Sequence, residues 1–166
     1  SEDDVPSLGL LDEKGNIRAG LAVMGQKAGL SLCDENMKLR LGLAVSKGTP
    51  RMIFYDASGK KRAHLEVSED GSPRLAFGDA KGRMRAALGV SKESAGLKVY
   101  DEKEVARAAF GLVGQDAGLN LADQNGVSRV SVHLSDDGSP NVQLGDEKGR
   151  IIWKAPFFRP RRPRKP

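Results

Sequence analysis

Six aspartates in this sequence are each followed six residues later by an arginine, within a recurring Asp-x-x-Gly-x-x-Arg pattern. Rows of carboxylates and guanidinium groups could bind a polymer or a cation. A turn-closing Asp followed by an outward Arg on the departing strand also explains the pattern, and exposed ion pairs contribute only about 0–1 kcal/mol each. We therefore predict a structural charge ladder, made of Asp12 and Arg18, Asp34 and Arg40, Asp56 and Arg62, Asp79 and Arg85, Asp101 and Arg107, and Asp123 and Arg129.

Two acidic segments, "SEDGS" and "SDDGS", place several oxygen donors close together, as calcium requires. Neither segment has the spacing of a calcium loop or of a calcium-binding β-helix repeat. A solvated turn is the favoured interpretation. No metal site and no cofactor are predicted.

Nucleophiles and bases are few. His64 and His133 fall at outward strand positions of separate repeats, and Cys33, the single cysteine, lies at a strand end. A catalytic triad needs a nucleophile, a base and an orienting group that converge, which these positions do not favour. The phosphate-binding, hydrolase and metalloprotease motifs are absent from the sequence. We predict no catalytic residues and no enzyme.

The C-terminal segment "IIWKAPFFRPRRPRKP" differs in composition from the rest of the chain. Five of the 27 basic residues lie in the last eight positions, and without them the basic residues equal the 22 acidic ones in number, so the formal charge of +5 belongs to the tail. Prolines favour an extended conformation there. Seven residues are candidates for binding a partner: Phe157, Phe158, Arg159, Arg161, Arg162, Arg164 and Lys165.

The partner expected for this tail is a protein in a larger complex or an anionic membrane surface. Each basic residue contributes about 1 kcal/mol near a charged membrane. Nucleic acid is disfavoured, because the neutral remainder of the chain offers no continuing basic track for phosphates.

The elements that carry these residues follow from an internal repeat. The turn aspartate recurs every 22 or 23 residues, at Asp12, Asp34, Asp56, Asp79, Asp101, Asp123 and Asp146. Apolar residues alternate with polar or small residues on both sides of it, as in the run Met84, Ala86, Leu88 and Val90. A period of two indicates strands with one apolar face, so each repeat is predicted to be a β-hairpin.

Glycine is expected to close most of the Asp turns, because it takes positive φ without strain. Met37 and Glu104 stand where two of these glycines should be, and Asn36 could assume the positive φ in its own turn. The longer connections "SEDGSPR" and "SDDGSPN" hold one extra residue, which predicts a bulge-type turn around Gly71 or Gly138.

We expect three segments: an N-terminal flank at 1–5, the hairpin domain at 6–156 and the basic tail at 157–166. A chain of 166 residues is long enough for one compact body with a sizeable core. The predicted class is all-β, with seven tandem hairpins rolled into a triangular β-prism or solenoid, within one chain or as a homotrimer. A β-trefoil is the alternative.

The unit "PRLAFGDAKGRMRAALGV" and the ending "IIWKAP" resemble uncharacterised bacterial envelope proteins in which a membrane anchor and coiled coil precede a β-repeat tail. The chain starts at Ser1 without methionine, and the resemblance implies an anchor ahead of it and makes trimerisation natural. It implies no activity. We expect a non-catalytic structural or assembly module of a cell-envelope or membrane-associated complex, with a carbohydrate- or polymer-binding module as the alternative.

Overall fold

The computed structural model describes residues 5–156, which hold fourteen β-strands and no helix. The chain divides into two compact units, residues 1–92 and 93–166, which we describe separately. The first unit contains β1 (Ser7–Leu11), β2 (Ile17–Met24), β3 (Lys27–Cys33), β4 (Leu39–Ser46), β5 (Thr49–Tyr55), β6 (Lys61–Val67), β7 (Pro73–Gly78) and β8 (Met84–Val90). The second contains β9 (Ser94–Tyr100), β10 (Ala106–Val113), β11 (Asp116–Ala122), β12 (Ser128–Leu134), β13 (Pro140–Gly145) and β14 (Ile151–Ala155).

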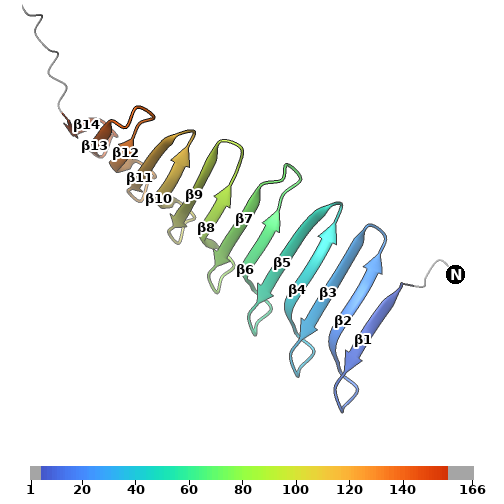
Figure 1. The fold of residues 1–166 in the computed structure, drawn as a ribbon. Helices are drawn as coiled ribbons and strands as arrows, with labels where there is room; N and C mark the ends of the chain where they lie inside the picture. The colour runs from blue at the N-terminus through green and yellow to red at the C-terminus, as the bar shows by residue number, and fades with distance from the viewer. Residues whose placement is uncertain (1–4, 157–166) are drawn as a thin grey trace, which may run out of the picture. The chain divides into compact units, whose positions relative to one another are not determined.

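Within each unit every strand pairs antiparallel with the next strand along the chain (Figure 1). The seven predicted hairpins are therefore confirmed. The pairing order stays linear, so the sheet of each unit is open and does not roll into a closed body. The β-trefoil alternative is wrong for the described residues, because a trefoil requires a closed barrel.

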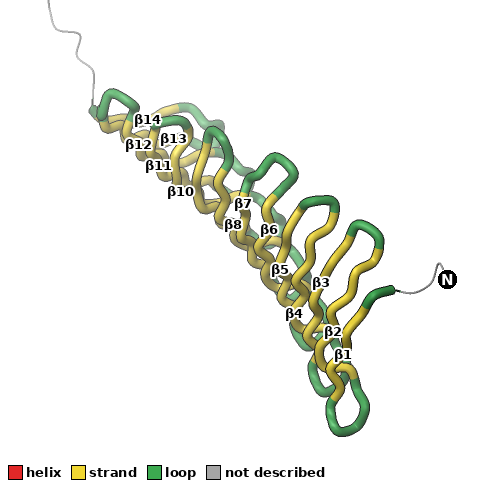
Figure 2. Tube along the Cα trace, turned by 45° about the vertical axis from the view of Figure 1, so that its right-hand side comes forward, coloured by secondary structure: helices red, strands yellow, loops and turns green. Residues whose placement is uncertain are grey.

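Two kinds of loop join the strands and lie at opposite ends of them (Figure 2). In each Asp turn, the backbone N–H of the aspartate donates to the carbonyl four residues on, and its own carbonyl accepts the N–H three residues on, as between Asp12 and Gly15 at 2.9 Å. At the other end, Gly25–Gln26, Lys47–Gly48 and Gly114–Gln115 are two-residue hairpin loops with positive φ at one or both positions.

A β-bulge accompanies every Asp turn. In the first hairpin, Leu10 pairs with Ala19 and Leu11 with Ile17, which leaves Arg18 as the extra residue. The same shift makes an arginine the bulged residue in five further turns, at Arg40, Arg62, Arg85, Arg107 and Arg129. The predicted bulge-type turns around Gly71 and Gly138 are confirmed. The N–H of Ser68 donates to the carbonyl of Ser72, the N–H of Gly71 donates to the carbonyl of Ser68, and Gly71 takes positive φ, as a turn with a G1 bulge requires; Ser135, Gly138 and Ser139 repeat the arrangement.

Met37 takes the positive φ of its turn itself, at 60°, so the suggestion that Asn36 does so was wrong. Left-handed backbone costs a residue with a Cβ about 1–2 kcal/mol. Met37→Gly is therefore expected to raise the free energy of unfolding by about 0.5–1 kcal/mol in a denaturant titration. This net gain is smaller than the relieved strain, because glycine also adds conformational entropy to the unfolded chain. Gly59→Met in the equivalent turn should lower it by about 1 kcal/mol. If Met37→Gly lowers the free energy of unfolding instead, the backbone of Met37 is not strained in this turn.

Candidate functional site: an uncovered apolar face

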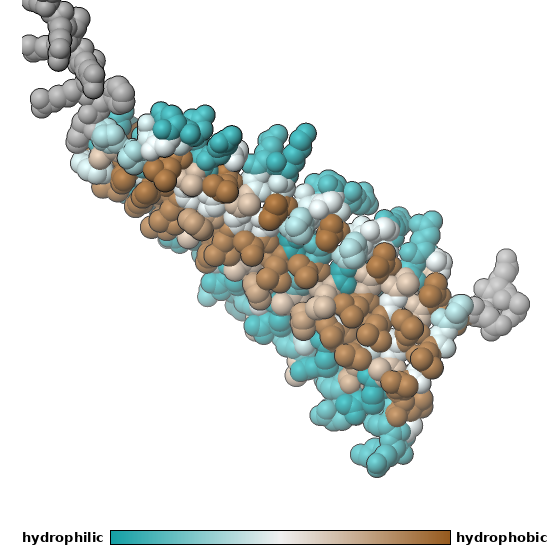
Figure 3. All heavy atoms as spheres, in the orientation of Figure 1, coloured by the Kyte–Doolittle hydropathy of each residue, from teal (hydrophilic) through white to brown (hydrophobic). Residues whose placement is uncertain are grey.

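The large apolar side chains of each unit lie on one face of its sheet, and nothing in the described part of the chain covers that face. Figure 3 shows hydrophobic residues gathered on the viewed face of each unit, between hydrophilic turns. Leu8 is 62% exposed, Phe110 64% and Leu88 48%. The sequence pattern placed these residues on one face correctly. The expected core is absent from the described residues of the single chain, because a one-layer sheet has nothing to pack against.

Strand register arranges this apolar face in rows that run across the strands. The middle row of the first unit consists of directly paired large residues: Leu8, Leu21, Leu30, Leu43, Met52, Leu65, Leu75 and Leu88. A turn-side row borders it toward the Asp turns: Leu10, Ala19, Leu32, Leu41, Phe54, Ala63, Phe77 and Ala86. A loop-side row borders it toward the other loops: Val23, Ala28, Val45, Pro50, Val67, Pro73 and Val90.

The second unit repeats the arrangement. Its middle row consists of Leu97, Phe110, Leu119, Val132, Val142 and Ala155. Its turn-side row consists of Val99, Ala108, Leu121, Val130, Leu144 and Trp153, and its loop-side row of Ala95, Leu112, Ala117, Leu134 and Pro140. None of these rows holds a charged residue in either unit.

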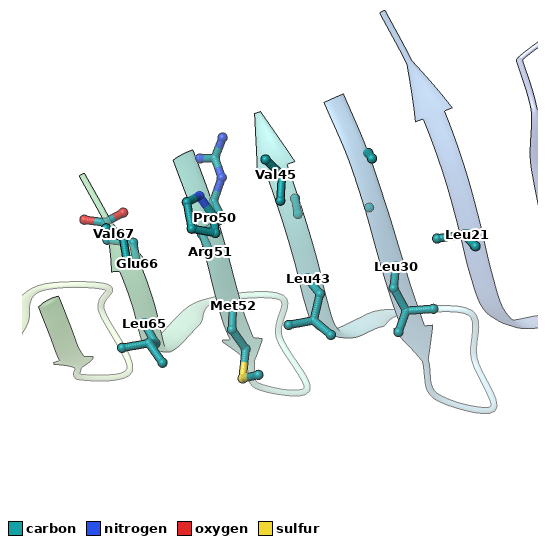
Figure 4. A pocket seen from close by; sticks show the side chains of 13 residues that line it. Leu21, Leu30, Leu43, Val45, Pro50, Arg51, Met52, Leu65, Glu66 and Val67 are labelled. Atoms are coloured by element: carbon teal, nitrogen blue, oxygen red, sulfur yellow. The ribbon is translucent and has the colours of Figure 1, made fainter. Parts of the chain in front are cut away.

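A hollow of about 450 Å³ opens along β2 to β6 on the first unit. Figure 4 shows Leu30, Leu43, Met52 and Leu65 side by side at one level, with Val45, Pro50 and Val67 at another. The hollow therefore follows the middle and loop-side rows. Its lining is aliphatic at these seven positions, so contact with apolar groups is the chemistry it offers.

The opposite face carries mostly small and polar residues, together with Ile53 and Met24. Ala76 and Ala87, at 2% and 9% exposure, are the buried apolar residues of the described chain, and both lie on this face. His64 pairs with Ile53 and Ala76 on the same face, and His133 pairs with Gly118 and Asn141 in the second unit. Both histidines therefore lie on the face opposite the apolar rows, as the alternation predicts. Burial lowers the pKa of His64.

The charge ladder forms as predicted, and it also joins neighbouring hairpins. The guanidinium nitrogens of Arg18, Arg62 and Arg129 lie 3.7, 3.3 and 3.4 Å from Oδ2 of their aspartates. The Nε–H groups of Arg18, Arg62, Arg107 and Arg129 donate at 2.8–3.2 Å to carbonyls of the next hairpin, those of Cys33, Gly78, Ala122 and Gly145. The arginines are therefore held in structural contacts.

Each turn carboxylate accepts hydrogen bonds from its own turn. Oδ1 of Asp123, for example, accepts the backbone N–H groups of Asn125 and Val127 at 2.9 and 3.2 Å. Hydrogen bonds to the ionised form lower the pKa of a carboxyl group. The Ser58 hydroxyl lowers the pKa of Asp56 to about 2, and the Arg83 guanidinium lowers that of Asp79 to about 2.

These pKa values predict loss of stability in acid. Because both pKa values are lower in the folded than in the unfolded chain, their contribution is complete above about pH 4 and disappears as the pH falls toward 2. We expect the melting temperature to fall steadily between pH 4 and pH 2 in circular dichroism. Asp56→Asn should melt at a lower temperature at pH 7 and show a weaker acid dependence. A constant melting temperature over this range would contradict the carboxylate contacts.

The seven candidate residues of the basic tail, Phe157 to Lys165, lie outside the described residues, and their binding role stays a prediction. Within residues 5–156 no group of three or more metal-ligating side chains is brought together, and no helix there is long and apolar enough to cross a membrane. No family model and no curated protein matches the sequence. The apolar face is therefore the candidate functional site.

Proposed function

We propose that this chain is a non-catalytic assembly module, whose apolar face is buried against further copies of the same protein. The observation that carries the proposal is the exposure of that face in both units. Monomeric soluble proteins rarely expose apolar patches above about 300–600 Å², and larger patches mark interaction sites.

Surface area supports the proposal. The chain exposes 12498 Å², whereas a compact monomer of its mass, 17.8 kDa, exposes about 8,000 Å². The excess is more than twice the roughly 800 Å² that each partner contributes to a standard interface. Burial of apolar area at about 25 cal/mol per Å² would supply the stabilisation that a one-layer sheet lacks.

Charge supports a copy of the chain as the partner. Identical surfaces that carry charge repel one another, but the rows of the apolar face hold none. The ionic groups of the ladder lie near the Asp turns, where they remain in water when the rows are covered.

A bacterial cell-envelope or membrane-associated complex is the setting we propose for this module. The repeat's resemblance to envelope proteins supports the setting. The basic tail supports attachment to a protein partner or to an anionic surface, because it holds the entire formal excess of charge.

Light scattering coupled to size-exclusion chromatography tests the proposal. We expect the 166-residue chain to elute as an oligomer at micromolar concentration and to keep that mass on dilution until the sheet unfolds. A folded, soluble monomer at every concentration would overturn the proposal and favour a face that binds a carbohydrate or another polymer.

A further inference from the structure

We infer that three copies of the chain form a triangular prism, in which each sheet is one wall and the middle row lies along the shared axis. This inference rests on the proposed function and names the number and arrangement of the copies. Two properties of the rows carry it: complementary side-chain sizes on most strands, and, in the first unit, loop-side residues that are smaller than the middle-row residues.

On most strands the two flanking positions complement each other in size; β4, with Leu41 and Val45, and β12, with Val130 and Leu134, carry two larger residues instead. On the other strands a large turn-side residue is matched by a small loop-side residue, as with Phe54 and Pro50 on β5 or Phe77 and Pro73 on β7. Where the turn-side residue is alanine, the loop-side residue is larger, as with Ala63 on β6. The rule also holds for Ala19 and Val23, Leu32 and Ala28, Ala86 and Val90, Ala108 and Leu112, Leu121 and Ala117, and Leu144 and Pro140.

Such complementarity within one strand serves no purpose in the isolated sheet, because the two positions lie four residues apart along the strand and about 13 Å from each other. Rotation about an axis parallel to the row direction brings the turn-side end of a strand against the loop-side end of the same strand in the next copy. On these strands each large residue then meets a small one, which is the arrangement that fills an interface without voids or overlap.

The smaller size of the loop-side row favours three copies over two. Each wall is a strand of about seven residues, or about 23 Å, so the centre of a triangular wall lies about 7 Å from the axis. The depth falls to zero at the corners. A two-sheet sandwich keeps a near-uniform spacing of about 10 Å.

The side chains of the middle and loop-side rows in the first unit fit a wall whose distance from the axis changes along the strand. Its middle row holds leucine or methionine on all eight strands, and its loop-side row holds only valine, alanine and proline. A flanking pair such as Ala63 with Val67 is smaller than two middle-row leucines. On such strands more space is needed at the centre of the wall than at its ends. The hollow along Leu30, Leu43 and Met52 lies under this centre and would receive the middle rows of the other two copies (Figure 4).

Native mass spectrometry combined with disulfide trapping tests the prism in the full chain. In a Cys33→Ser background, we introduce Ala63→Cys and Val67→Cys together, one in each flanking row of β6. In the prism, each new turn-side thiol meets the loop-side thiol of the next copy, so oxidation should give covalent trimers on a non-reducing gel. Each single variant is a matched control and should give none, because turn-side rows do not meet one another.

The outcomes separate this inference from the proposed function. A native mass of three chains with covalent trimers supports the prism. A mass of two chains, with covalent dimers, overturns the prism and leaves the assembly module intact. A single chain overturns both, and three chains without cross-links would show that other surfaces meet and overturn the prism.

Discussion

Replacing Leu43 by aspartate is expected to break the assembly into single chains. Leu43 lies in the middle row between Leu30 and Met52, on the wall of the hollow. An unpaired carboxylate buried there would cost several kcal/mol per copy, more than the roughly 1.5–3 kcal/mol that burial of one leucine contributes. Light scattering should report a mass near 17.8 kDa, or loss of the folded signal in circular dichroism.

Gly42→Asp provides the matched control, because Gly42 is the neighbouring residue on β4 and its side chain would point to the opposite face. A Cβ at Gly42 has no other atom within 4 Å, so the substitution meets no steric obstacle. The Gly42→Asp variant should keep the oligomeric mass of the wild type. If both variants behave alike, the apolar face is not the interface.

Replacing Gly111 by alanine is expected to lower the free energy of unfolding by about 2–3 kcal/mol, as overpacking does in tight interiors. Gly111 and Gly96 face each other across β9 and β10, and a Cβ on Gly111 would overlap the carbonyl of Ala95 and lie 2.6 Å from Cα of Gly96. These are backbone atoms that a rotamer change cannot move away. The two strands would have to separate or shift.

Gly42→Ala is the control for Gly111→Ala, since it occupies the same face in open space. Its effect should be neutral or slightly stabilising, because alanine loses less conformational entropy on folding than glycine. Denaturant titrations of both variants should be run at one protein concentration, because the stability of an oligomer depends on concentration. Equal stabilities for the two variants would contradict the close approach of β9 and β10.

Most of the fold could be predicted from the sequence repeat. The fixed position of the turn aspartate and the alternation on both sides of it were enough to predict seven hairpins, since each hairpin is a local structure. Strand register then followed from the turns, which placed Leu43 and His64 on opposite faces as expected.

Burial could not be predicted in the same way. Alternation shows that residues such as Leu88 share a face, but it does not say what covers the face, because the covering surface is not encoded in the local pattern. The bulge was missed for a different reason. Arg18 and its equivalents looked like ordinary outward residues, and the regular spacing of the Asp-x-x-Gly-x-x-Arg unit was the available signal for an extra residue in the strand after the turn.

Met37 shows a third limit. Asparagine tolerates positive φ better than methionine, so propensity alone favoured Asn36. The hydrogen bonds of the turn decide otherwise: the N–H of Met37 donates to the carbonyl of Asp34 at 3.0 Å, which fixes the third residue after the aspartate in the left-handed conformation.

Fluorescence quenching of Trp153 tests the central claim most directly, because Trp153 is the single tryptophan of the chain and lies in the turn-side row opposite Leu144. Its side chain is 41% exposed in the isolated chain. If copies of the protein cover the apolar face, iodide should quench the emission of the native protein far less than that of the denatured protein, and the native emission should be shifted to the blue. Native emission that iodide quenches as readily as the denatured emission would show that the face stands open to water, and would contradict the account.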